Sequence, residues 1–299
     1  MLTAAPERIT YQASGMTFHA LTWGPANGPL ALCLHGYPDS AWTWRHLGPH
    51  LAERGWRVVA PFTRGYGPTD LAPDHCYQVG ALVADVVRAH EALGGDERAV
   101  LIGHDWGSMT VVPAAAHSPQ RFAKVVAMSV PPLGAMGGKP SNGLAKQAAL
   151  LARQARCSWY MAFQQLPRVS ERSLPRLIPK LWADWSPGYD ATEDVAHLFT
   201  ALDSQARSTA ALSYYRAMAR PWTQQSTYAE FQKYWLTLPD CPVLYLHGER
   251  DGCLLLDFAR QAEPRLGENS RMQVVANAGH FLQLEQPDAV NSAISGFLS

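Results

Sequence analysis

The residues of this sequence that could do chemistry are led by an aspartate in a tight turn. Asp105 is the centre of Gly-His-Asp-Trp-Gly at 103–107, between an apolar run and a helix-like segment. Glycines on both sides permit the strained turn that presents a nucleophile at the top of a sheet. The alternative is that Asp105 only caps the following helix, because Asp is a favoured N-cap residue.

Two later residues strengthen the first interpretation. Asp251 comes just after the apolar run at 241–247, and His280 comes just after the run at 271–276. An aspartate after a strand is usually a turn former when it stands alone, and a single late histidine is usually a surface residue. Together with Asp105, however, they follow the chain order nucleophile, acid, histidine. This order predicts a triad in which Asp251 orients His280 and His280 acts as the base.

A fourth motif, His-Gly-Tyr-Pro-Asp at 35–39, follows the first buried run. The loop in this position can supply one backbone N–H of an oxyanion hole, and the residue after the nucleophile supplies the other. We therefore expect the amides of Tyr37 and Trp106 to be these donors. A plain strand-to-helix turn would explain the glycine and proline equally well, but not its association with the motif at 103–107.

An aspartate nucleophile indicates a particular substrate chemistry. Attack by a carboxylate on saturated carbon gives an ester on the protein, and water can then hydrolyse that ester at its carbonyl carbon. The substrate should therefore carry a leaving group on sp³ carbon, which means an epoxide oxygen or a halide. An alkoxide needs an acidic O–H nearby, and Tyr160, Tyr214 and Tyr215 lie in helix-forming segments that could supply one. Spacing alone does not choose among these three, and aromatic residues more often serve packing.

The elements that must position these residues form an α/β pattern. Strands are expected at 8–13, 16–23, 29–35, 56–62, 98–105, 124–130, 241–247 and 271–276. Helices are expected at 41–54, 80–93, 106–117 and 287–297, which gives a mostly parallel sheet flanked by helices. Residues 133–235 show only helical stretches broken by prolines. We therefore predict a core domain from 1–132 and 236–299 with a helical cap inserted at 133–235, over the sheet edge where ligands bind.

These motifs together resemble the epoxide hydrolases of the α/β-hydrolase fold, and the resemblance covers nearly the whole chain. It is most specific at 158–166 and 213–221, which are similar to bacterial soluble epoxide hydrolases. The resemblance implies that Tyr160 and Tyr215 hold the epoxide oxygen and protonate it. Plant and animal relatives often place the first tyrosine four residues before a phenylalanine. Counted from Phe163, that position is Trp159 in this chain, whereas Tyr160 fits the bacterial spacing of three. If that register held, Trp159 would face the site in place of Tyr160.

The resemblance implies a small hydrophobic epoxide as substrate, a vicinal diol as product, and neither metal nor organic cofactor. Further residues are expected to contact the substrate: Trp106, Trp159, Tyr214 and His104.

Three other functions compete with this interpretation. A haloalkane dehalogenase would share the motif at 103–107, but one large group of these enzymes has Asn at the position of Tyr37. A fluoroacetate-type dehalogenase is less favoured, because Trp106 and Met109 stand where that family has arginines. A non-catalytic ligand-binding protein on the same scaffold usually lacks a triad member, and none is missing here.

Composition narrows the setting of this activity. The chain has 299 residues with 25 Lys+Arg and 25 Asp+Glu, and its formal net charge is therefore zero. This balance does not favour nucleic acid or a membrane surface as a partner. Five cysteines without C-x-x-C spacing favour reduced thiols and a cytoplasmic location. The aromatic residues of 133–235 suit a hydrophobic pocket, internal packing or a homodimer contact, and the sequence does not choose among these.

Overall fold

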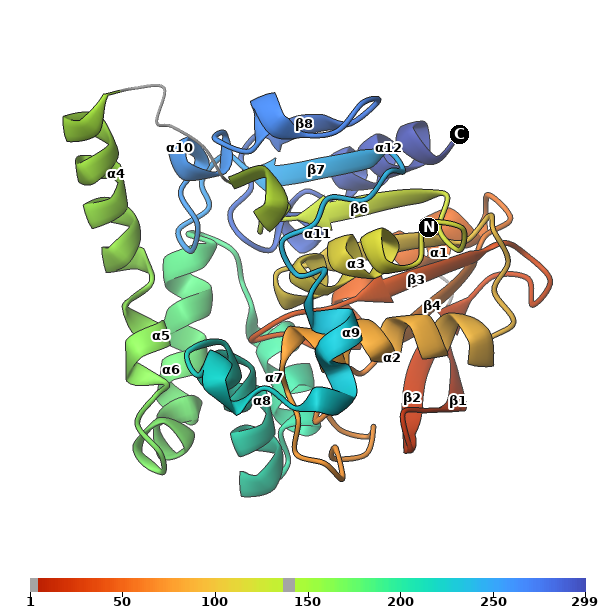
Figure 1. Cartoon of the computed structure of the whole chain (residues 1–299), viewed down its shortest axis with the longest axis horizontal. Helices are drawn as coiled ribbons and strands as arrows, with labels where there is room; N and C mark the ends of the chain where they lie inside the picture. Colours follow the sequence, from red (N-terminus) through yellow and green to blue (C-terminus); the bar gives the residue numbers. More distant parts are fainter. Residues whose placement is uncertain (1–4, 137–142) are drawn as a thin grey trace.

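One eight-stranded sheet organises the chain (Figure 1). The computed structural model describes residues 5–136 and 143–299. The strands are β1 Glu7–Ala13, β2 Met16–Trp23, β3 Leu30–Leu34, β4 Arg57–Pro61, β5 Val100–His104, β6 Lys124–Met128, β7 Val243–Gly248 and β8 Arg271–Val275. Their order is β1-β2-β4-β3-β5-β6-β7-β8. All eight predicted strands are present, with ends shifted by at most two residues.

The sheet is mostly parallel. Only β1 with β2 and β2 with β4 pair antiparallel, and the neighbours from β4 through β8 pair parallel. Parallel strands bring their carboxyl ends to one edge, so the segments that follow β3, β5, β7 and β8 meet there. The predicted fold class is therefore confirmed, and the loops with the candidate residues share one edge.

Helices cover both faces of this sheet. Helices α2 (Val79–Ala92) and α3 (Trp106–His117) pack against each other on one face, and α1 (Leu47–Ala52) packs with α12 (Pro287–Leu298) on the other (Figure 1). Every residue of β3 and β5 is buried as a result. Strands buried on both faces read as continuous apolar runs, which is why the sequence located them.

One predicted helix is wrong in its extent. The segment 41–54 was expected to be a single helix, but it is a 3₁₀ turn at Ala41–Trp44 followed by the short helix α1. Pro49 lies at the start of α1 and has no N–H to donate to the carbonyl of Arg45. A continuous α-helical hydrogen-bond ladder therefore cannot run through this position.

The inserted segment 133–235 contains helices and no strand among its described residues. Its helices are α4 Leu144–Cys157, α5 Trp159–Phe163, α6 Val169–Trp185, α7 Thr192–Ala201, α8 Gln205–Met218 and α9 Ala229–Gln232, with 3₁₀ turns at Leu133–Met136, Pro221–Thr223 and Ser226–Tyr228. After β7 come α10 Leu256–Ala259, a 3₁₀ turn at Glu263–Arg265 and, past β8, α11 Leu282–Glu285. We call residues 133–235 the cap segment.

The cap segment is fastened to the core at the sheet edge. The indole N–H of Trp182 donates to the carbonyl of Pro38 at 2.9 Å, and its ring stacks on Phe281 with centroids 3.4 Å apart. Farther along, the amide of Gly67 donates to the carbonyl of Ala201 at 2.8 Å. Trp182 and Phe281 are both buried, so this contact is part of one continuous apolar core.

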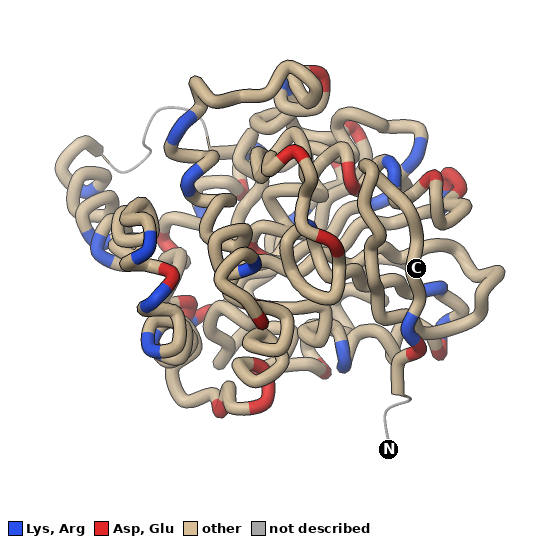
Figure 2. The backbone as a smooth tube through the Cα atoms, turned by 90° about the horizontal axis from the view of Figure 1, so that it is seen from below, with Lys and Arg blue, Asp and Glu red and all other residues tan. Residues whose placement is uncertain are grey.

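Charge is unevenly spread although the total is balanced. Residues 143–185 hold seven Lys+Arg and only two Asp+Glu, and Figure 2 shows the blue positions gathered at the end of the molecule where these helices lie. None of the described helices is long and apolar enough to span a bilayer.

Candidate active site

The turn between β5 and α3 has the strained geometry of a nucleophile turn. Asp105 has φ 53° and ψ −117°, a conformation that costs a non-glycine residue energy and persists only when its surroundings enforce it. The turn is also tightly packed, because a Cβ on Gly107 would lie 2.0 Å from the carbonyl oxygen of Leu34. Only glycine fits there, which accounts for the spacing that the sequence showed.

The Asp105 carboxylate is held between two groups on neighbouring loops. Its Oδ1 accepts the backbone N–H of Tyr37 at 2.8 Å, and its Oδ2 lies 3.7 Å from Nε2 of His280. A Cβ on Gly36 would lie 2.4 Å from that Oδ1 and 2.6 Å from the amide nitrogen of Trp106. The amides of Tyr37 and Trp106, predicted as oxyanion donors, therefore lie at the carboxylate.

His280 and Asp251 form a buried pair beside the nucleophile. Nδ1 of His280 lies 2.9 Å from Oδ2 of Asp251, whose Oδ1 accepts the backbone amides of Cys253 and Leu254. Burial lowers the pKa of His280, but the carboxylates of Asp251 and Asp105 outweigh it and raise that pKa to about 10. The same pairing lowers the pKa of Asp251 although burial alone would raise it. The three residues predicted as a triad are thus brought together.

The backbone of His280 is anchored by residues that sequence reasoning missed. Its N–H donates to the carbonyl of Trp185 in α6 at 3.0 Å, and its carbonyl accepts the hydroxyl of Ser129 at 2.5 Å. That carbonyl also lies 2.9 Å from Nε2 of His104. His104, which we expected to contact the substrate, is instead fully buried against His280 and Phe281. No short motif marks these contacts, since they join distant parts of the chain.

Two tyrosines of the cap segment meet next to Trp106. The rings of Tyr160 in α5 and Tyr215 in α8 are 5.6 Å apart at 84°, and the ring of Tyr215 is 5.1 Å from Trp106 and 5.2 Å from Tyr37. Burial raises the pKa of both hydroxyls, and the negative charge of Asp105 adds to the rise. Both are therefore protonated donors at neutral pH, within electrostatic reach of the nucleophile.

The register question is answered by burial. Tyr160 is 4% exposed, whereas Trp159 is 40% exposed and packs against Phe163 at the surface. Successive residues of a helix point about 100° apart, so only one of the two can face inward. Tyr160 is therefore the one that faces inward, and Trp159, expected to contact the substrate, lies at the surface.

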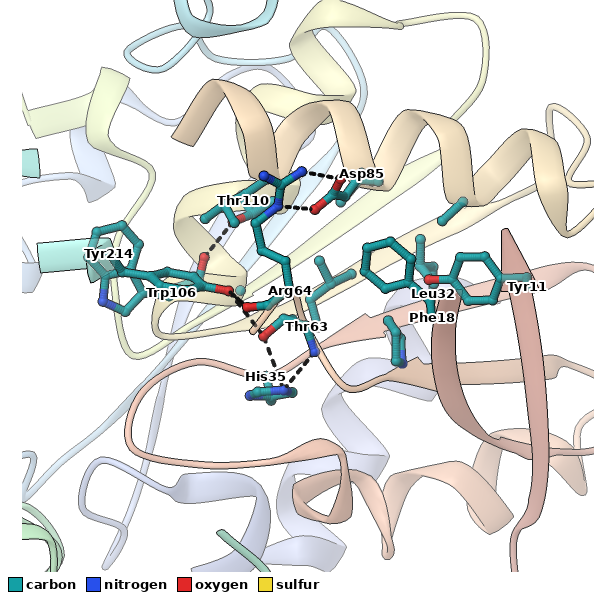
Figure 3. A pocket seen from close by; sticks show the side chains of 16 residues that line it. Tyr11, Phe18, Leu32, His35, Thr63, Arg64, Asp85, Trp106, Thr110 and Tyr214 are labelled. Carbon is teal, nitrogen blue, oxygen red and sulfur yellow. Dashed lines mark hydrogen bonds and ion pairs between the residues drawn. The ribbon is translucent and has the colours of Figure 1, made fainter. Parts of the chain in front are cut away.

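Tyr214 also differs from its expected place. Its hydroxyl donates to the carbonyl of Arg64 at 2.8 Å, and with Trp106 it lines the cavity of Figure 3, in which Arg64 pairs with Asp85. That cavity measures about 30 Å³, which suits a water molecule rather than an organic substrate. Asp105 is not part of its lining.

One group of metal-binding side-chain types lies in the described part of the chain. Ligand atoms of Asp251, Cys253 and His280 fall within 4.8 Å of one another. Asp251 and His280 already share a hydrogen bond, so the group is better suited to orienting a base than to holding a cation.

Comparison with known proteins agrees with this geometry. A family model described as the alpha/beta hydrolase fold matches residues 29–287. Epoxide hydrolase A of Mycobacterium tuberculosis is 27% identical over 99% of this chain and 98% of its own length. Among solved structures, epoxide hydrolase A of Mycobacterium thermoresistibile has a TM-score of 0.74 at 26% identity over 98% of each chain. An epoxide hydrolase of Vigna radiata shares the fold, with a TM-score of 0.75 at 23% identity over 98% of each chain.

Proposed function

This chain belongs to the alpha/beta hydrolase fold family, and we propose that it is an epoxide hydrolase that converts a small hydrophobic epoxide into a vicinal diol. The observation that carries the proposal is the pair of buried tyrosines, Tyr160 and Tyr215, beside an aspartate nucleophile. The names of the full-length relatives support it.

The first half-reaction opens the epoxide. Asp105 attacks the less hindered or more electrophilic ring carbon, and a C–O bond to the carboxylate forms while the ring C–O bond breaks. Tyr160 and Tyr215 hydrogen-bond the ring oxygen, and one of them passes its proton to it. The product of this step is a hydroxyalkyl ester of Asp105. In this scheme residues 133–235 act as a cap domain that brings the two acids to a nucleophile of the core, 1–132 and 236–299.

The second half-reaction hydrolyses that ester. His280, oriented by Asp251, removes a proton from water, which attacks the carbonyl carbon of the ester. The oxyanion that forms is held by the amides of Tyr37 and Trp106, and its collapse releases the diol and restores Asp105. Once Asp105 is an ester it carries no charge, so one of the two carboxylates that raise the pKa of His280 is lost. The pKa of His280 then falls, and more of the imidazole is in the neutral form that can accept a proton from water.

Product analysis on paired substrates tests the proposal. The purified protein is incubated with aryl and alkyl terminal epoxides and with matching chloro- and bromoalkanes. Diol formation without halide release is expected. Halide release with inert epoxides would make the chain a haloalkane dehalogenase, and no product from either class would favour a ligand-binding role.

Variants of the tyrosines make the test specific. Tyr160→Phe and Tyr215→Phe should each slow ester formation by roughly 10²-fold, the lower range for loss of a general acid. Tyr189→Phe is the matched control, because its hydroxyl also lies in the cap segment but donates to Asp194. Equal effects of all three substitutions would contradict the role of Tyr160 and Tyr215 in binding the ring oxygen.

The cytoplasmic location and a homodimer stay predictions from the sequence.

A further inference from the structure

Cys253 holds a defined place between the triad and the cap segment. Its amide donates to Oδ1 of Asp251 at 2.7 Å, and its carbonyl accepts the side-chain N–H of Gln154 in α4 at 2.9 Å. The residue is 6% exposed. Because its backbone is bonded on both sides, the position of its thiol is set by the core and by α4 together.

That thiol is in contact with one of the two proposed acids. Sγ of Cys253 lies 3.5 Å from the hydroxyl oxygen of Tyr160, within hydrogen-bond reach for sulfur. The Tyr160 ring is wedged against Trp185 and Tyr215, with centroids 4.9 and 5.6 Å away. By contrast, the hydroxyl of Tyr215 has no partner at hydrogen-bond geometry among the described residues. The two acids are therefore not equivalent: Tyr160 contacts a thiol, whereas Tyr215 lies near the side chain of Trp106, which partly offsets the rise in the pKa of Tyr215.

The chemistry of this contact follows from which atom carries the proton. Burial and the charges of Asp251 and Asp105 raise the pKa of the Cys253 thiol well above its usual range, so it is present as S–H. A hydroxyl has one proton and two lone pairs. The Tyr160 hydroxyl is protonated as well, so either atom can donate across this contact. When S–H donates to one lone pair, the Tyr160 proton stays free for another acceptor, and the phenolate that forms on proton transfer keeps a donor.

We propose that Cys253 is a positioning residue for ring opening: its thiol donates to the oxygen of Tyr160 and directs the Tyr160 proton toward the epoxide oxygen. This inference rests on the proposed function. In the step concerned, the Asp105–carbon bond forms, the ring C–O bond breaks and the Tyr160 proton moves to the freed oxygen. Ester hydrolysis later releases one proton from water, which restores the Tyr160 hydroxyl.

Step-resolved kinetics of Cys253 variants test this role, with styrene oxide as the probe. Single-turnover ester formation and ester hydrolysis are measured separately for wild type, Cys253→Ala and Cys253→Ser. Loss of one hydrogen bond should slow ester formation about tenfold in Cys253→Ala and leave hydrolysis within about twofold. Cys253→Ser keeps a donor and should stay within about threefold of wild type in both steps. Cys241→Ala is the control, a half-buried cysteine before β7.

A double-mutant cycle identifies the partner. Once Tyr160→Phe has removed the acceptor, adding Cys253→Ala should cost nothing further in ester formation, whereas in a Tyr215→Phe background it should still cost about tenfold.

Unchanged ester formation in Cys253→Ala, or a tenfold loss that persists without the Tyr160 hydroxyl, would overturn the inference and leave the proposed function standing. A wild-type protein that makes no diol would remove the proposed function and this inference with it.

Discussion

At the scale of single residues, Asp105 separates chemistry from architecture. Its side chain is the proposed nucleophile. Its strained backbone is held by the tight packing of the neighbouring glycines, which a change of the Asp105 side chain leaves in place. Asp105→Asn should therefore keep the fold and lower ester formation by roughly 10⁴-fold or more, because a neutral amide is a poor nucleophile. Intact-protein mass spectrometry after exposure to epoxide checks the adduct. A freshly prepared Asp105→Asn protein that is alkylated at the wild-type rate would contradict the assignment. A slow recovery of ester formation during storage would instead indicate deamidation of the asparagine to Asp.

His280 serves the second half-reaction alone in this scheme. His280→Gln should still accept the alkyl group on Asp105 but should stall there, since no base activates water. We expect one ester per protein molecule by mass spectrometry and no diol release, because the whole substrate stays bound to Asp105 until the ester is hydrolysed. The scheme fails if the variant is alkylated no faster than it turns over.

The charge on His280 also predicts how stability changes with pH. Its pKa is raised from 6.5 to about 10 in the folded protein. The protonated form is thus favoured by folding, and this contribution is complete below pH 6.5 and is lost as pH rises through about 10. Urea unfolding at pH 6.5, 8 and 9.5 should show a fall in stability that is smaller in His280→Gln. An equal fall in both proteins would mean that the pair is not charged.

At the scale of elements, α6 and α8 are joined by one buried ion pair. Nη1 of Arg216 lies 2.7 Å from Oε1 of Glu171, and Nε of Arg216 donates to the carbonyl of Gln164 at 3.0 Å. Since Arg216 follows Tyr215 directly, the pair fixes the turn of helix that presents this tyrosine.

Arg216→Met should cost about 3 kcal/mol of stability, because it leaves the largely buried Glu171 carboxylate without a cation and with only the hydroxyls of Ser170 and Thr209 as side-chain partners. It should also slow ester formation. Lys180→Met, which breaks the exposed pair with Asp184, is the control and should cost less than about 1 kcal/mol. Thermal unfolding and single-turnover kinetics measure the two effects, and equal losses in both variants would contradict this reading.

The strands, helices and site residues differ in how far the sequence could predict them. The buried central strands, such as β3 and β5, were found because they are short apolar runs. Prolines misled in the cap segment, where α6 continues through Pro175 and Pro179. Both prolines are exposed, so water can bond the carbonyls that lose a partner. The triad followed from chain order, but the Tyr160–Cys253 contact joins residues 93 positions apart and has no local signature.

At the scale of the whole molecule, core and cap segment share one apolar cluster. Residues from both, such as Trp106, Tyr160, Trp182 and Phe281, belong to the same set of packed buried side chains. We therefore expect a single cooperative unfolding transition rather than two. Five tryptophans lie in 1–132 and five in 133–235, so fluorescence reports on both parts. The midpoint of urea unfolding followed by tryptophan fluorescence should coincide with the midpoint followed by far-ultraviolet circular dichroism. Two separated midpoints would contradict a common core.

The stacking of Trp182 on Phe281 has a consequence for how such a protein can change over evolutionary time. Phe281 is the residue after His280, so the piece of chain that carries the proton donors rests directly on the piece that carries the base. An exchange of inserted segments between homologues would have to bring a matching aromatic partner for Phe281 or displace the base. Point substitutions in the cap helices, away from this stack, can change the substrate contacts without moving His280. A library for altered selectivity is therefore best built on α5 and α8 with Trp182 held constant.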